Sequence, residues 1–462
     1  MSIATATSLR VAPSEVHDTL KQHMLADGFG VVLDLERSHG SWLYDSLRER
    51  ELLDFFTNFS SYPMGYNHPK LLTPEVRERL LRAAVVKPSN ADLYTPYFAE
   101  FVATFARTVP AAYQKRLFFV DGGALAVENA LKAAFDWKVR KNFAAGRKEE
   151  LGRQVIHFRQ AFHGRNGYTL SLTNTDPRKT DYFPKFDWPR IHNPSLSFPV
   201  TEEVLRRVQE EERRAIDAIH QALSERAPDV AAIIIETIQS EGGDNHFRPE
   251  FLRALRQIAD EHEVMLVFDE VQTGFATTGR WWCFEHFGVE PDLFAFGKKT
   301  QQCGMASTAR VDEVDSVFKV SSRINSTWGG NLVDMVRCQR FVEIIEEDDL
   351  VKNAEVMGRH LLAGLRELEG VFPGQVTNAR GLGLYAAFDL PSTELRNAAI
   401  KAMAEQAMMA LPCGERSVRF RPALVVCREE IDEGMRRSER ALGQVLRSGV
   451  AVPAPSTAAV RE

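Results

Sequence analysis

The sequence predicts an α/β fold in which a large domain contains a mostly parallel sheet and a smaller α/β domain follows toward the C-terminus. Two observations predict it. Through the middle of the chain, short runs that are apolar on both faces alternate with segments of helical periodicity, which is typical of a parallel sheet covered by helices on both sides. Past about residue 335, a shorter succession of strand, helix, strand and helix indicates the second domain.

The N-terminal part and the strands of the large sheet come first. Ser14 is placed to cap a helix over residues 14–25. Residues 31–57 alternate polar and apolar side chains and contain turn signals, which predicts short antiparallel strands. The apolar runs that predict strands of the large sheet are RLFFVDGG (116–123), QVIHFR (154–159), VAAIIIETI (230–238), VMLVFDEV (264–271) and DLFAFGK (292–298).

Helices are predicted between these runs, and a second α/β pattern follows them. The segments of helical period cover residues 124–138 and 249–263, and the strongly charged stretch 202–226 is interpreted as a helix with a solvated face. The elements predicted for the smaller domain are strands over 381–390 and 417–426 and helices over 392–410 and 428–446.

The length of 462 residues favours two or three domains. We divide the chain into an N-terminal segment, 1–59, that packs with the small domain, a large domain, 60–334, and a small C-terminal domain, 335–462. Each boundary lies where the pattern of predicted elements changes.

Composition excludes several classes of function. The net charge of −6 argues against a nucleic-acid or anionic-membrane partner. No apolar run approaches the roughly 18 residues of a membrane helix, and the first residues lack the apolar core of a signal peptide. The five cysteines are scattered without a CxxC pair, so neither a metal site nor a disulfide framework is indicated. We therefore expect a cytoplasmic protein.

Polar residues follow several of the predicted strands at the ends where α/β proteins bind ligands. The first run ends in Asp121, Gly122 and Gly123 and opens into a helix, whose free N–H groups suit a phosphate, although a plain strand–helix turn would have the same sequence. Asp269 ends another run, where it is either a functional carboxylate or a helix cap or ion-pair partner. Lys298 follows a third run.

A phosphate site, a semi-buried aspartate and a strand-end lysine together indicate pyridoxal 5'-phosphate. This cofactor needs an anion site, a lysine that forms a Schiff base and an acid beside its pyridinium nitrogen. The acid keeps the ring protonated, and the lysine can move a proton as a general base. Two of the twelve histidines, His68 and His163, are predicted to be turn or packing residues rather than ligands.

The sequence resembles the class III, pyridoxal-phosphate-dependent aminotransferases of fold type I, and the matches extend over most of the chain. The resemblance implies a seven-stranded-type sheet and a homodimer with its active site at the subunit interface. Within the class, the sequence most resembles enzymes that transfer the ε-amino group of L-lysine to 2-oxoglutarate. The matching segments include GGALAVENALKAAF (122–135), AFHGR (161–165), FDEVQTGF (268–275), PDLFAFGK (291–298), STWGGN (326–331) and VRFRPAL (418–424).

The resemblance assigns the cofactor-binding residues. It places Asp269 at the pyridinium nitrogen and selects Lys298, which lies 29 residues later, rather than its neighbour Lys299 for the Schiff base. It places Phe162 on the face of the ring and Gln272 near the 3-oxygen and the substrate. The remaining predicted contacts are to the phosphate, from the backbone of Gly123 and Ala124 and from Thr327 of the partner subunit.

The resemblance also implies how two carboxylates are bound. Arg165 and Arg419 would each hold a substrate carboxylate, because a guanidinium group suits bidentate pairing. Glu241 would cover Arg419 in one half-reaction and move away in the other. Arg421 is the alternative to Arg419, since side chains two residues apart on a strand face the same way. Asn325 is a further candidate contact to the substrate.

Other functions stay open at this point. The nearest is another ω-aminotransferase that uses ornithine, 4-aminobutyrate or a diamine. A racemase or mutase of the same fold and a relative without catalytic activity are the others. The loop KKTQQCG (298–304) departs from the pattern of the broader class, which weakens the inference about the substrate.

Overall fold

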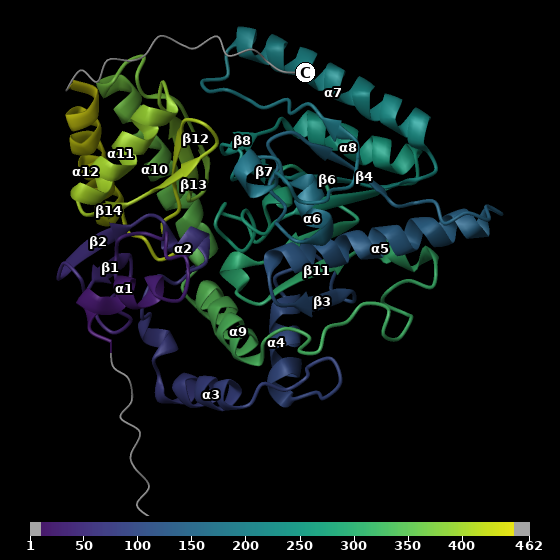
Figure 1. Ribbon diagram of the computed structural model, residues 1–462, viewed down its shortest axis with the longest axis horizontal. Coiled ribbons are helices and arrows are strands. Elements are labelled where there is room, and N and C mark those ends of the chain that lie inside the picture. Colours follow the sequence, from purple (N-terminus) through teal and green to yellow (C-terminus); the bar gives the residue numbers. More distant parts are fainter. Residues whose placement is uncertain (1–10, 448–462) are drawn as a thin grey trace, which may run out of the picture.

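A seven-stranded sheet forms the centre of the larger part of the chain (Figure 1). The computed structural model describes residues 11–447. Strand β11 runs antiparallel to both of its neighbours and the other neighbouring strands pair in parallel, which confirms the mostly parallel sheet. In sheet order the strands are β3 Leu117–Val120, β11 Cys303–Ser307, β10 Leu293–Phe296, β9 Met265–Asp269, β6 Val230–Glu236, β4 Gln154–Phe158 and β5 Arg190–Ile191.

Both faces of this sheet are covered by helices, as its apolar strands require. In β6, Ile233 and Ile235 pack into one core and Ala232 and Ile234 into another on the opposite face. Helix α5 (Gly123–Ala144) covers the second face, and α8 (Pro249–Glu261) and α4 (Pro96–Ala106) contribute to the first. Burying a side chain of this size contributes about 1.5–3 kcal/mol. Successive residues of each strand enter opposite cores, so apolar side chains are favoured at every position of the strand.

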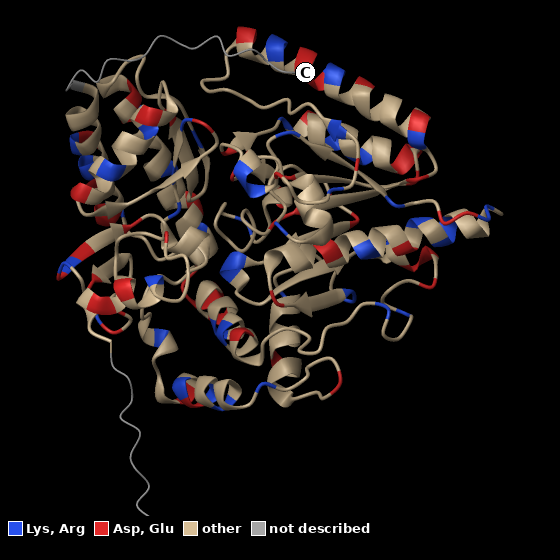
Figure 2. Cartoon of the chain, in the orientation of Figure 1, with Lys and Arg blue, Asp and Glu red and all other residues tan. Residues whose placement is uncertain are grey.

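The charged segment after β5 forms a long surface helix, as predicted. Helix α7 (Glu202–Arg226) carries Arg, Asp and Glu side chains along its length (Figure 2). Val208, Ala215 and Ile219 are buried on its inner side. The helix is therefore amphipathic, with one face in solvent.

Two strands of the large sheet were absent from the sequence prediction. Strand β5 has only two residues, which is too short to show a periodic pattern. Strand β11 has the sequence CGMAS, whose small side chains have low strand propensity. Both depend on pairing with neighbouring strands rather than on their own sequence.

The smaller sheet differs in detail from the prediction. Residues 381–390 do not form one strand, because Gly383 adopts a φ of +57° and turns the chain between β12 and β13. Residues 392–410 do not form one helix, because α11 (Thr393–Glu405) ends before the short strand β14 (Met408–Met409), and the strand predicted over 417–426 ends at Phe420. The bounds of this sheet are β12 Thr377–Leu382, β13 Tyr385–Asp389, β16 Ser417–Phe420 and β15 Leu411–Cys413.

The N-terminal segment lies against this C-terminal part (Figure 1). The predicted antiparallel strands are confirmed as β1 (Trp42–Asp45) and β2 (Arg50–Asp54), and β2 also pairs with β14. The cap predicted at Ser14 is wrong, since this residue lies inside a turn of 3₁₀ helix that begins at Pro13. The division of the chain at residues 59 and 334 stays a prediction, which the pairing of β2 with β14 supports.

Further helices complete the described part of the chain. Among residues 11–447, no helix is both long enough and apolar enough to cross a membrane. The helices that remain to be named are α1 Val16–Lys21, α2 Thr57–Ser60, α3 Pro74–Val85, α6 Gly167–Leu172, α9 Leu332–Glu347, α10 Leu350–Val371 and α12 Arg428–Arg447.

Candidate active site

A cavity of about 270 Å³ lies at the carboxyl ends of the central strands. Strand β3 points the same way as β10, because each is antiparallel to β11, so the ends of β3, β6, β9 and β10 meet at one edge. Eight of the eleven predicted site residues line this cavity: Gly123, Ala124, Phe162, Arg165, Glu241, Asp269, Gln272 and Lys298.

The turn after β3 is shaped for close approach by a ligand. Gly122 has a φ of +100°, which favours glycine, and α5 begins at Gly123. A Cβ on Gly123 would lie 2.9 Å from a methyl group of Val271, so this position also requires glycine. The first N–H groups of a helix have no partner within it and attract an anion. The N-terminus of α5 therefore offers a phosphate site at the cavity wall.

The segment AFHGR packs directly on this turn. Gly164 has a φ of +132°, and a Cβ there would lie 2.4 Å from the Cβ of Ala124. The absence of a side chain at Gly164 thus brings Phe162 and Arg165 next to the helix N-terminus. Arg165 is exposed, and its guanidinium carbon lies 6.0 Å from the centroid of the Phe162 ring.

Asp269 is the last residue of β9 and is 5% exposed. Its Oδ1 accepts a hydrogen bond from the backbone N–H of Val271 at 3.0 Å, and its Oδ2 lies 2.8 Å from Nδ1 of His163. Since a carboxylate only accepts hydrogen bonds, we assign the proton of this contact to the histidine. Asp269 is not a helix cap, and its buried charge is compensated by His163.

Two functional candidates were missed at this edge. His163, expected to be a packing residue, pairs with Asp269, and its position inside AFHGR was the available signal. Glu236 ends β6 directly beside Asp269 in the sheet, and burial raises its pKa to about 7. A carboxylate at the end of an entirely apolar strand was the signal for Glu236.

The two adjacent lysines have different surroundings. Lys298 lines the cavity and has a φ of +50°, and burial and then the nearby Arg419 lower the pKa of its amine. Lys299 is 2% exposed and donates to the backbone carbonyl of Gln272 at 2.5 Å. Only Lys298 can therefore meet a ligand in this cavity.

The two arginines at the end of β16 are also distinguished by their partners. Nη2 of Arg419 lies 2.8 Å from Oε2 of Glu241, while its Nε and Nη1 are buried and have no hydrogen-bond partner among residues 11–447. Nη2 of Arg421 lies 2.6 Å from Oδ1 of Asp244, with its guanidinium carbon 3.3 Å from the centroid of the Tyr385 ring. Among the described residues Nε of Arg421 also has no hydrogen-bond partner, so the two arginines differ mainly in their counter-ions: Asp244 is buried, whereas the Glu241 side chain is 27% exposed.

Lys179 is a further charged group at the site, with no signal in the sequence. Its Nζ lies 2.7 Å from Oε1 of Glu241, so this carboxylate contacts two cations. Burial tends to raise the pKa of Glu241, but Arg419 and Lys179 together hold it below its usual value.

Asn325 and Thr327 do not line the cavity of their own chain. Both are exposed in the irregular segment before α9. The segment is attached to the body of the chain by a 3.0 Å hydrogen bond from the backbone N–H of Asn90 to the carbonyl of Trp328.

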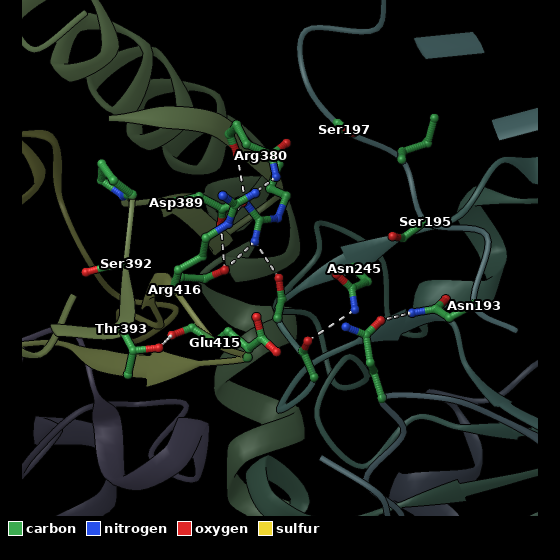
Figure 3. A pocket seen from close by; sticks show the side chains of 18 of the residues that line it. Asn193, Ser195, Ser197, Asn245, Arg380, Asp389, Ser392, Thr393, Glu415 and Arg416 are labelled. Atoms are coloured by element: carbon green, nitrogen blue, oxygen red, sulfur yellow. Dashed lines mark hydrogen bonds and ion pairs between the residues drawn. The ribbon is translucent and has the colours of Figure 1, made fainter. Parts of the chain in front are cut away.

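A second cleft, of about 890 Å³, is larger than this cavity but lacks its chemistry. None of the eleven predicted site residues lines it. Figure 3 shows Asn193 and Asn245 on one side and the ion pair of Arg380 with Asp389, 2.9 Å apart, on the other. We place the active site in the smaller cavity because it combines a helix N-terminus, a buried aspartate and a lysine.

Comparisons with known proteins agree with this geometry. The family model described as Aminotransferase class-III matches residues 26–442. The chain is 50% identical to the L-lysine-epsilon aminotransferase of Streptomyces clavuligerus over 425 residues, which covers 91% of this chain and 92% of that protein.

More distant and structural relatives were also found. The 4-aminobutyrate aminotransferase of Sus scrofa is 32% identical over 411 residues, covering 84% of this chain and 80% of that protein. The solved structure of the lysine aminotransferase from M. tuberculosis matches with a TM-score of 0.92 and 49% identity, covering 94% of this chain and 100% of that chain.

Proposed function

Because the chain belongs to the class III aminotransferases, we propose that it transfers the ε-amino group of L-lysine to 2-oxoglutarate. The products are 2-aminoadipate 6-semialdehyde and L-glutamate. One observation carries the choice of substrates: the pair of Arg419 and Glu241 stands beside Lys298 in a chain 50% identical to L-lysine-epsilon aminotransferases.

Class III aminotransferases of fold type I use pyridoxal 5'-phosphate, and the cavity fits this cofactor. The N-terminus of α5 faces the cavity with Gly123 and Ala124, which offer backbone donors to the phosphate. Asp269, buried and held by His163, suits a cationic ring nitrogen. Gln272 and the ring of Phe162 line the remaining wall. When bound, the cofactor supplies a carbonyl carbon for amines and an electron-withdrawing ring.

Lys298 and Asp269 carry the proton chemistry in this proposal. The lowered pKa of Lys298 increases the fraction of neutral amine, which is the form that acts as nucleophile and base. In the first half-reaction its Nζ would move a proton from the reacting carbon of the donor to the bound cofactor, and in the second it would move a proton from the cofactor to the former 2-oxo carbon of 2-oxoglutarate. Asp269 keeps a proton on the ring nitrogen through its negative charge, and His163 fixes the carboxylate in place.

The two arginines account for two substrates of different shape. L-Lysine reacts through its side-chain amine, so its α-carboxylate lies far from the reacting carbon, within reach of the exposed Arg165. 2-Oxoglutarate reacts next to its α-carboxylate, which requires a cation close to Lys298. Arg419 is this cation once Glu241 moves away, and its unpartnered Nε and Nη1 are the donors that a carboxylate needs.

The assembly and location belong to the same proposal. The enzyme is a cytoplasmic homodimer in which Thr327 contacts the phosphate bound by the partner subunit and Asn325 contacts its substrate. The exposure of both residues on their own chain supports this arrangement. Size measurement by light scattering should give the mass of a dimer, and a monomer that is fully active would contradict it.

A nitrogen-labelling experiment tests the choice of donor. The purified enzyme with its cofactor and 2-oxoglutarate receives L-lysine labelled with ¹⁵N at either the ε- or the α-amino group. We expect label in glutamate from the ε-position only, and no glutamate from the Lys298→Ala control. Label from the α-position, or no glutamate at all, would contradict the proposal.

The second candidate is a different ω-amino donor. The 32% identity to a 4-aminobutyrate aminotransferase favours testing it, since both donors carry an amine and a distant carboxylate. A panel of L-lysine, L-ornithine, 4-aminobutyrate and a diamine, each with 2-oxoglutarate, ranks them by kcat/KM. The highest value for any donor other than L-lysine would replace the first assignment.

A further inference from the structure

The carboxylate of Glu241 is shared between two cations from distant parts of the chain. Oε2 contacts Arg419 at 2.8 Å and Oε1 contacts Lys179 at 2.7 Å. The backbone of Glu241 is fixed, because its carbonyl accepts a hydrogen bond from the N–H of Gly414 at 2.8 Å. Any movement that exposes Arg419 is therefore a rotation of the Glu241 side chain.

Lys179 lies where it can stay paired with Glu241 during that rotation. It ends a short 3₁₀ turn (Pro177–Lys179) in the irregular segment between α6 and β5, and Asp176 caps this turn by accepting the N–H of Arg178 at 3.0 Å. Its Nζ lies 5.4 Å from the centroid of the Phe162 ring, at the cavity. Its long side chain contacts Oε1 of Glu241, the carboxylate oxygen that Arg419 does not contact.

A carboxylate in a partly buried site is destabilised when it leaves the only cation that pairs with it. Glu241 has a second cation, so the carboxylate stays paired after Arg419 is released. Removing Lys179 costs little while Arg419 still holds Glu241, but it costs more once Glu241 has moved. The loss of Lys179 thus shifts the equilibrium toward the covered Arg419.

We propose that Lys179 is a positioning residue that keeps Glu241 paired when it leaves Arg419, and so makes Arg419 available to the carboxylate of the 2-oxo acid. This inference rests on the proposed function, in which Arg419 binds that carboxylate. Lys179 acts through Glu241 and not by touching the substrate.

The test measures binding of glutarate, a dicarboxylate that cannot react, to the holoenzyme by calorimetry. Lys179→Met should raise the dissociation constant about tenfold, and Lys179→Arg should restore most of the affinity. The matched control is Lys185→Met on the same segment, whose Nζ only donates to the carbonyl of Thr180 at 3.0 Å and which should leave the constant unchanged.

A second measurement, made in the Glu241→Ala variant, separates an indirect role of Lys179 from direct contact with the ligand. In Glu241→Ala, Arg419 is permanently uncovered, so adding Lys179→Met should change glutarate binding less than twofold. In turnover, Lys179→Met should lower the ratio of kcat/KM for 2-oxoglutarate to that for L-lysine about tenfold.

Two outcomes would overturn the inference. They are unchanged glutarate binding in Lys179→Met, and an equal loss in the Glu241→Ala background, which would mean direct contact or a general structural role. Thermal midpoints of all variants identify misfolding. Where Lys179→Met is misfolded, glutarate binding is compared between Lys179→Arg and the unaltered enzyme. If L-lysine proves not to be the donor, the proposed function fails, but the glutarate measurement still decides the role of Lys179.

Discussion

Replacing Arg421 with Met is expected to lower the free energy of unfolding by about 3–5 kcal/mol. Arg421 and Asp244 are each 1% exposed and lie 2.6 Å apart. The guanidinium group also donates to the carbonyl of Phe420 at 2.9 Å and stacks on Tyr385. The variant leaves Asp244 as a buried charge without an ion-pair partner among the described residues, which is the costly way to break such a pair.

Arg419→Met is the matched comparison two residues earlier on the chain. Its partner Glu241 is 27% exposed at the side chain and keeps Lys179, so no isolated buried charge remains. We expect a loss of stability below about 2 kcal/mol and loss of measurable glutarate binding. Arg421→Met should instead retain most of its glutarate affinity where the protein is folded.

The assays are urea unfolding of the holoenzyme and calorimetric binding of glutarate. The double variant Asp244→Asn, Arg421→Met should recover about half of the lost stability, because the buried carboxylate of Asp244 is replaced by a neutral amide. The reasoning is refuted if Arg421→Met is as stable as Arg419→Met, or if both weaken glutarate binding equally.

The remaining predictions concern the reacting groups and one buried histidine. Lys298→Ala should abolish turnover while the fold persists; substantial glutamate formation from L-lysine would refute its role. His163→Ala should lower kcat at least tenfold and raise the dissociation constant of the cofactor, because Asp269 loses its 2.8 Å partner; His163→Gln, which retains a donor, should be less affected. Burial beside Arg380 and Arg421 lowers the pKa of His246 to about 3 from 6.5, so this residue contributes stability above pH 6.5 that is lost as the pH falls toward 3. His246→Phe should therefore remove roughly 2 kcal/mol of the decline in stability between pH 6.5 and about pH 5, as measured by urea unfolding, and an unchanged decline would contradict this.

Much of the site was predictable because it follows from local sequence patterns. Asp269 and Lys298 each come after an apolar run, and in a parallel sheet the ends of such runs meet at one edge. Gly122 and Gly123 stand where a strand passes directly into a helix, and the positive φ of Gly122 agrees with that reading. None of these inferences needs to know which distant segments touch.

Several of the missed features depend on contacts between distant segments. His163 and Lys179 are ordinary polar residues in the sequence, and only the packing of their segments brings them to Asp269 and Glu241. Strand β11 was missed for the same reason, since its small residues form a strand only between β3 and β10.

The pair Arg419 and Arg421 shows most clearly what the sequence predicted and what the tertiary structure added. The sequence by itself predicted two arginines, two residues apart, on the same face of a strand, because side chains alternate with a period of two; the strand ends at Phe420, so only Arg419 lies in it. This alternation is the same for both residues and does not distinguish their roles; only the resemblance favoured Arg419. The tertiary structure gives them different partners: Glu241, partly exposed and shared with Lys179, lies against Arg419, and Asp244, fully buried, lies against Arg421. This difference supports the proposal that Arg419, whose counter-ion is partly exposed, binds a substrate, whereas Arg421, buried with its counter-ion, stabilises the fold.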